Sequence, residues 1–178
     1  ILRMKKLFSK LRHNPPQPIP WRQGAERTAA LASMTHPPRQ PLFSESELYY
    51  LRSGTHCLMY SKLGAHPDVV DGVAGTRFAV WAPNARDVSV LWDANGWTAG
   101  RDILHPSEDG IWSAFLPGIG AGQAYKFGIR TAWGDVIQKA DPFEFYAELR
   151  PKSASIVCDL GGYSWHDQDW VRHRQTTN

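Results

Sequence analysis

Apolar residues recur at every second position in two neighbouring stretches, residues 76–81 and 88–92. This period of two is typical of half-buried β-strands, because successive side chains point to opposite faces. Pro83 ends the first run, since proline donates no ladder hydrogen bond, and the Asn-Gly pair at 95–96 favours a turn after the second. The two runs are therefore expected to form strands joined by a turn, with Trp97 following a second turn.

Short strand-like runs continue through the second half of the chain. They lie at residues 111–116, 124–130, 136–139 and 155–159, with turn sequences between them. Short strands at intervals of roughly ten residues, without an alternating strand–helix pattern, indicate an all-β sandwich. Its core is expected to include Phe78, Val80 and Val90.

The chain before the first of these strands has two parts of different character. Residues 1–43 contain seven of the thirteen prolines, together with eight Lys and Arg residues and a single acidic residue. Dense proline prevents regular helix and sheet, so this segment is expected to be a disordered basic tail. Ser44 and Glu47 then have the spacing of a capping box, which predicts a short helix over residues 44–51.

Four regions are therefore expected: the tail at 1–43, a short helix and lead-in segment at 44–72, the sandwich at 73–160, and the start of a linker at 161–178. The tail leaves two interpretations open, a solvated extension or a basic segment that binds anionic polymers. No aromatic interleaving or nucleic-acid motif accompanies its charge. This favours the solvated extension, and no nucleic-acid partner is expected.

Several classes of protein are disfavoured by what the sequence does not contain. It has no apolar run of the ~20 residues that a membrane span needs, and its basic start has no apolar signal region. Cys57 and Cys158 lie far apart in no metal or redox spacing, so reduced thiols in a cytoplasmic protein are expected. Hydrolase, nucleotide-binding and zinc-protease motifs are missing, and neither a cofactor nor a metal site is expected.

Three residues of the predicted strands and turns suit the binding of a sugar. A sugar ring stacks its C–H face on an aromatic side chain and takes hydrogen bonds at its hydroxyl rim. Trp97 follows a turn, Lys126 faces away from Tyr125 and Phe127 on its strand, and Trp133 lies at an expected hairpin tip. These positions predict a platform for a curved glucan. The alternative is that both tryptophans are ordinary exposed or edge-packed aromatics.

Five motifs resemble the N-terminal region of 1,4-α-glucan branching enzymes, which contains a carbohydrate-binding module of family 48. They are LGAHP at 63–67, FAVWAPNA at 78–85, NGW at 95–97, YKF at 125–127 and KADPF at 139–143. The resemblance covers about residues 47–173. It implies an immunoglobulin-like β-sandwich, and it implies an α-glucan site formed by Trp97, Lys126 and Trp133.

The sequence departs from the pattern of this family beside the expected site. Ala94 stands where the family usually has a bulky aromatic residue, and Trp92 stands where a small residue is usual. The turn before Trp97 is therefore expected to have a different shape, with Trp92 filling the volume that Ala94 leaves.

The resemblance implies an enzyme whose catalytic machinery this chain does not carry. Branching enzymes transfer α-1,4-glucan chains with an Asp and a Glu on a (β/α)₈ barrel, and such a barrel takes about 250 residues. The chain is therefore expected to be a fragment or truncated product, inactive alone, with α-glucan and the catalytic barrel as partners and no membrane. A second hypothesis is a structural module that only docks on the barrel.

Overall fold

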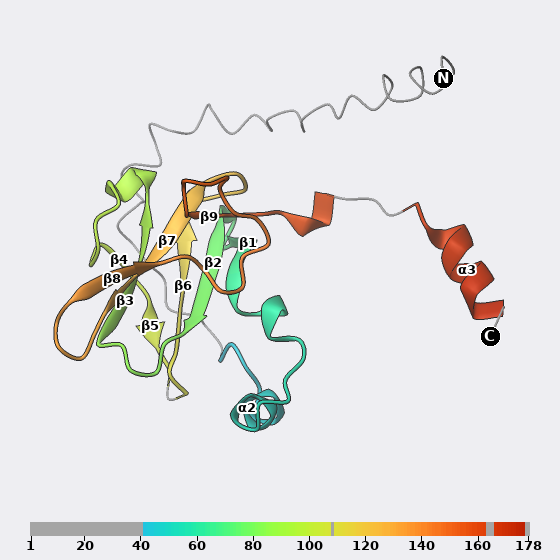
Figure 1. The fold of residues 1–178 in the computed structure, drawn as a ribbon, viewed down its shortest axis with the longest axis horizontal. Coiled ribbons are helices and arrows are strands. Elements are labelled where there is room, and N and C mark those ends of the chain that lie inside the picture. Colours follow the sequence, from blue (N-terminus) through green and yellow to red (C-terminus); the bar gives the residue numbers. More distant parts are fainter. Residues whose placement is uncertain (1–40, 108, 163–165, 177–178) are drawn as a thin grey trace, which may run out of the picture.

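The computed structural model describes residues 41–107, 109–162 and 166–176. Two antiparallel sheets pack face to face (Figure 1). The first sheet has the order β1 (Gly64–Val70), β2 (Val73–Trp81), β6 (Ile111–Pro117), β5 (His105–Pro106). The second has the order β4 (Asp102–Ile103), β3 (Asp87–Trp92), β7 (Ala124–Arg130), β8 (Val136–Lys139), and β9 (Ser155–Ile156) also pairs with β7.

The hydrophobic core lies between the two sheets. Phe78, Val80 and Val90 belong to it, as the alternation of apolar residues predicts. The ring of Phe78 meets that of Tyr125 edge to face, with 5.0 Å between centroids, a geometry that aromatic pairs favour. The prediction of an immunoglobulin-like β-sandwich is confirmed.

A short helix packs against part of the outer side of the first sheet. Helix α2 (Glu45–Arg52) begins at Ser44, whose side chain and that of Glu47 form the predicted capping box. Leu48 and Leu51 pack against a second buried cluster that includes Ala79 of β2. Because Ala79 alternates with the core residues of β2, this cluster lies outside the sandwich and fastens the lead-in segment to it.

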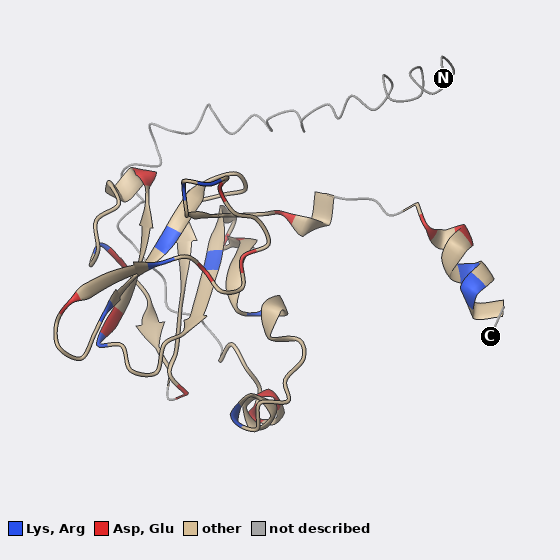
Figure 2. Ribbon diagram, in the orientation of Figure 1, with Lys and Arg blue, Asp and Glu red and all other residues tan. Residues whose placement is uncertain are grey.

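The other helical segments of the described residues are short. They are η2 (Met59–Ser61), η3 (Asp93–Asn95), η4 (Leu160–Gly162) and α3 (Gln168–Thr176). Within the described residues, no helix is long and apolar enough to cross a membrane. Basic and acidic residues are interspersed over the sheets and loops (Figure 2). The expected basic tail lies outside the described residues, apart from residues 41–43.

Strand β1 lies inside the segment that was expected to be only a lead-in. It pairs with β2 along its whole length, from Gly64 opposite Ala79 to Val70 opposite Val73. The sandwich therefore begins before residue 73. Gly64 and Pro67 suggest a loop in sequence, but β1 is an edge strand, where a proline needs no partner on its open side.

Candidate functional site

The turn after β3 presents Trp97 in an unusual backbone conformation. One turn of 3-10 helix, η3, leads into Gly96 and Trp97, whose φ angles are +63° and +56°. The backbone N–H of Trp97 donates to the carbonyl of Trp92 at 3.0 Å and closes the turn. A left-handed conformation is uncommon for a bulky residue, so the fold around this turn must hold it in place.

The two residues that depart from the family pattern lie in different surroundings. Trp92 is buried in the core, whereas Ala94 is exposed. The indole of Trp92 therefore fills core volume from β3 itself, and Ala94 contributes none. The expectation that Trp92 fills the volume left by Ala94 stays a prediction, because the side chain of residue 94 lies outside the core.

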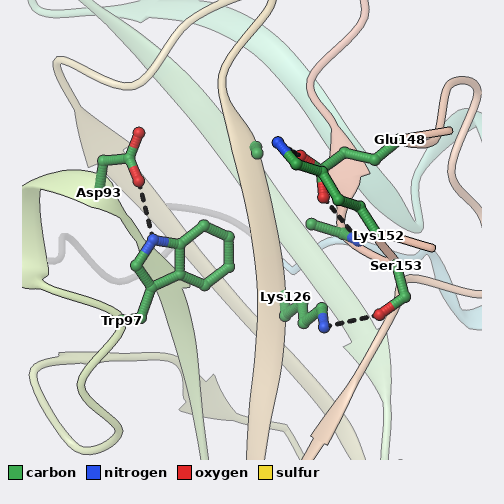
Figure 3. Close-up of a pocket in the computed structure, with 8 residues that line it drawn as sticks. Asp93, Trp97, Lys126, Glu148, Lys152 and Ser153 are labelled. Atoms are coloured by element: carbon green, nitrogen blue, oxygen red, sulfur yellow. Dashed lines mark hydrogen bonds and ion pairs between the residues drawn. The ribbon is translucent and has the colours of Figure 1, made fainter. Parts of the chain in front are cut away.

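The indole of Trp97 lines a pocket on the outside of the second sheet (Figure 3). Its Nε1 donates to Oδ1 of Asp93 at 2.8 Å, which fixes the orientation of the ring. The pocket has a volume of about 450 Å³, within the range of small-molecule sites. Its lining comes from three separate segments and consists of Asp93, Trp97, Ala124, Lys126, Glu148, Lys152, Ser153 and Ala154.

Strand β7 supplies the floor of the pocket. Tyr125 and Phe127 are buried in the core, so Ala124 and Lys126 face outwards, as the alternation predicts. The ammonium of Lys126 donates to Oγ of Ser153 at 2.9 Å. Trp97 and Lys126, two of the three predicted site residues, therefore lie at one pocket (Figure 3).

The loop that leads into β9 forms another wall of the pocket. The sequence did not indicate that this loop belongs to the site. Glu148 accepts from the backbone N–H of Ala154 at 3.2 Å and lies 3.3 Å from the ammonium of Lys152. These residues have no periodicity or motif that marks a binding site, because they reach the pocket only through the pairing of β9 with β7.

Trp133 lies apart from the other two predicted site residues. It is on the turn between β7 and β8 and is 89% exposed, and it does not line the pocket. Arg130 pairs with Val136, so the turn projects from the end of β7 opposite to Ala124. The Cα atoms of Lys126 and Arg130 are about 13 Å apart at the usual rise of a strand, and Trp133 follows beyond Arg130.

A buried polar cluster beneath the pocket anchors the loop wall. The hydroxyl of Tyr125 donates to Oδ2 of Asp141 at 2.6 Å, and the backbone N–H of Asp141 donates to Oγ of Ser155 at 2.8 Å. Burial raises the pKa of the Asp141 carboxyl, and the hydrogen bond from Tyr125 opposes that rise. Burial also raises the pKa of the Tyr125 hydroxyl. The cluster ties β7 to β9, and so fixes the loop against the floor.

The arrangement suits the binding of an uncharged polar ligand. Two carboxylates, Asp93 and Glu148, and two ammonium groups, Lys126 and Lys152, line the pocket together with one indole. Within the described residues, no group of three or more His, Cys, Asp or Glu side chains is placed to hold a metal ion. An aromatic face beside hydrogen-bonding groups of both kinds is the chemistry that a sugar ring requires.

Comparison with known families identifies the sandwich. The family model "Carbohydrate-binding module 48 (Isoamylase N-terminal domain)" matches residues 62–144. Residues 62–144 therefore match a carbohydrate-binding family. The match starts just before β1 and ends after the buried cluster at Asp141, so it contains both the Trp97 turn and the floor of the pocket.

Curated relatives of this chain confirm its resemblance to branching enzymes. The 1,4-alpha-glucan branching enzyme GlgB of Synechococcus sp. (strain JA-3-3Ab) is 50% identical over 135 residues, which are 75% of this chain and 18% of the relative. GlgB of Synechocystis sp. (strain ATCC 27184 / PCC 6803 / Kazusa) is 45% identical over 140 residues, 79% of this chain and 18% of the relative. The chain thus spans about a fifth of the length of these relatives.

Solved structures also match part of this chain. A pullulanase from Bacillus acidopullulyticus is 22% identical, with a TM-score of 0.43, over 56% of this chain and 12% of that protein.

Proposed function

We propose that this chain binds an α-glucan as the N-terminal module of a glycogen branching enzyme. The observation that carries the proposal is the meeting of Trp97 and Lys126 at one pocket, within residues that match a carbohydrate-binding family. In the full-length enzyme the module holds glucan chains close to the catalytic barrel, which transfers them to 6-hydroxyl groups. The expected setting is the cytoplasm.

The pocket offers a sugar both of the contacts that it needs. The hydrogen bond to Asp93 fixes the ring of Trp97, and an indole held in this way stacks with little loss of side-chain entropy. The ammonium of Lys126 carries three N–H donors and uses one of them on Ser153, so donors remain for the hydroxyls of a sugar. Glu148 supplies acceptors on the opposite wall.

The balance of charge in the pocket favours a neutral glucan over an anionic ligand. Each ammonium group has an oxygen partner, Ser153 for Lys126 and Glu148 for Lys152. A phosphate would have to lie close to the carboxylates of Asp93 and Glu148, and like charges at short range oppose this.

Trp133 is proposed as a contact for longer glucans only. Its indole is 89% exposed and lies past the far end of β7, so a ligand that fills the pocket does not reach it. A glucan of several sugar units that runs along the outer face of β7 meets both tryptophans. Trp133 then contributes to the binding of polymers and not to that of short oligosaccharides.

A second candidate function, docking without sugar binding, is favoured by one observation. Several large apolar side chains outside the pocket are more than half exposed, among them Tyr49, Leu58 and Tyr146. Exposed apolar groups of this kind suit a contact with another domain. In this alternative the module packs on the catalytic barrel and has no affinity for glucan.

Electrophoresis of the chain in a native gel that contains glycogen distinguishes the two functions. Glucan binding retards the wild type relative to a gel without glycogen, and Trp97→Ala or Lys126→Ala removes most of the retardation. Equal mobility of the wild type in the two gels would favour the docking function.

A further inference from the structure

The left-handed backbone at Gly96 and Trp97 rests on a buried polar network. Trp92, Asn95 and Asp102 are 2%, 3% and 1% exposed. Oδ2 of Asp102 accepts from Nε1 of Trp92 at 2.6 Å and from Nδ2 of Asn95 at 2.7 Å. The carboxylate of Asp102 therefore joins the first and last side chains of the turn that precedes Gly96.

The side-chain amide of Asn95 makes three hydrogen bonds within the turn and to its neighbours. Besides Asp102, its amide donates to the carbonyl of Val90 at 2.7 Å, and its Oδ1 accepts from the backbone N–H of Trp92 at 3.1 Å. Asn95 directly precedes Gly96. Its fixed position therefore sets where the backbone enters the left-handed conformation that aims Trp97 at the pocket.

We propose that Asp102 is a positioning residue of the glucan site, an inference that rests on the proposed function. Asp102 does not line the pocket and acts through two partners. Through Asn95 it holds the backbone of the turn. Through Trp92 it holds the residue that immediately precedes Asp93, whose carboxylate orients the indole of Trp97.

The chemistry of the network explains why a carboxylate occupies this position. Two N–H donors converge on one oxygen, and an ionised acceptor binds such donors more strongly than a neutral amide does. Burial of a charge is unfavourable in a core that apolar residues would otherwise fill. Asp102 is 1% exposed and lies in a strand of only two residues. Its burial is explained by the two hydrogen bonds with which its carboxylate aligns Trp92 and Asn95.

Trp92 is a hydrogen-bond donor in this network as well as a core residue. The indole Nε1 of Trp92 is one of the two donors to Oδ2 of Asp102. Phenylalanine fills much of the same core volume but has no N–H. The Trp92→Phe variant therefore tests the hydrogen bond apart from most of the packing.

The test compares Asp102→Asn and Trp92→Phe with Thr76→Val. Thr76 is fully buried in the other sheet and donates to the carbonyl of Ile119 at 2.7 Å, so Thr76→Val removes a buried hydrogen bond that involves no residue of the turn. Two readouts are taken on the full chain: the dissociation constant for a soluble maltooligosaccharide, and the indole ¹H–¹⁵N resonance of Trp97, assigned by its loss in Trp97→Phe.

Asp102→Asn is expected to shift the Trp97 indole resonance and to weaken sugar binding about tenfold, because a neutral amide oxygen holds the two N–H donors less strongly and so positions the turn less well. Thr76→Val is expected to lower the thermal midpoint with neither effect. An unshifted Trp97 resonance in Asp102→Asn would overturn the positioning role. If Asp102→Asn does not fold, Trp92→Phe decides by the same two readouts.

The two proposals fail in different ways. If the wild type binds no sugar, the proposed function is wrong, and the indole resonance still reports whether Asp102 positions Trp97. If the wild type binds and Asp102→Asn binds equally well, with its Trp97 resonance unmoved, only the positioning role is wrong.

Discussion

The ammonium of Lys126 donates to the hydroxyl of Ser153 at 2.9 Å, which joins the outer face of β7 to the loop before β9. This hydrogen bond connects the floor of the Trp97 pocket to one of its walls. It also places the ammonium at a defined point on the pocket surface. Lys126 is therefore a structural link as well as a proposed binding group, and mutation separates the two roles.

Removal of the Lys126 side chain is expected to weaken glucan binding more than removal of its partner. Lys126→Ala loses a charged donor and is expected to cost about 1.5–3 kcal/mol of binding free energy, whereas Ser153→Ala frees the ammonium and costs less than about 1 kcal/mol. Titration calorimetry with a maltooligosaccharide measures both. Lys139→Ala, on exposed β8 outside the pocket, is the matched control. Equal affinities of Lys126→Ala and Lys139→Ala for the maltooligosaccharide would contradict a glucan site at Lys126.

Trp133 is expected to matter only for long ligands. In Trp133→Ala the affinity for a short maltooligosaccharide stays at the wild-type value, because the indole lies outside the pocket. Retardation by glycogen in a native gel decreases, but by less than in Trp97→Ala. A loss of affinity for the short ligand as large as that in Trp97→Ala would show that Trp133 is part of the same subsite.

Tyr125→Phe is expected to destabilise the fold in a pH-dependent way. Burial raises the pKa of Asp141, so folding favours the protonated carboxyl, and the stability from this group is lost as pH rises through the folded pKa. The hydroxyl of Tyr125 favours the charged form by donating to it. Its removal therefore costs about 1–3 kcal/mol at neutral pH and less in acid, where Asp141 is protonated.

Urea unfolding at neutral and acidic pH measures this difference. Tyr146→Phe is the control, because Tyr146 is 58% exposed. A cost of Tyr125→Phe that is the same at both pH values would show that the hydroxyl does not act through the Asp141 carboxylate.

Glu47 is expected to stabilise the lead-in helix above acidic pH. The hydrogen bond from Lys62, at 2.6 Å, and those at Ser44 lower the pKa of Glu47 to about 2. Its contribution is present above the unfolded pKa of 4.5 and disappears as pH falls towards 2. Because both partners are about 30% exposed, Glu47→Gln is expected to cost only about 0.5–1 kcal/mol at pH 7.

Thermal unfolding of Glu47→Gln and the wild type at several pH values checks this prediction. Glu45→Gln, on the first turn of the same helix, serves as the comparison. The difference between Glu47→Gln and the wild type should shrink below pH 4.5. A difference that stays constant to pH 3 would contradict the assigned pKa.

The sequence predicted the strands that have clear alternation and missed those that depend on tertiary pairing. The runs at 111–116, 124–130 and 136–139 correspond to β6, β7 and β8. The segment between Trp97 and Gly110 shows no alternation of apolar and polar residues, yet it contains β4 and β5. Each has two residues, too few to show a period, and each exists because a longer strand pairs with it.

The candidate site was likewise predictable only where it depends on a local pattern. An Asn-Gly turn indicated an accessible Trp97, and the alternation along β7 placed Lys126 on the outer face. Glu148 and Asp102 carry no local signal, since one reaches the pocket through the pairing of β9 and the other lies buried beneath the turn. The position of Trp133 depends on the length of the β7–β8 turn, which the hairpin register fixes.

The most direct test of the glucan site is a titration of the ¹⁵N-labelled chain with a soluble maltooligosaccharide, followed by NMR. The proposal predicts that the largest shifts occur at the indole of Trp97 and at the backbone amides of Lys126 and Ser153, while the indole of Trp170 on α3 does not move. Shifts centred on other residues, or none at millimolar sugar, would contradict a glucan site in this pocket.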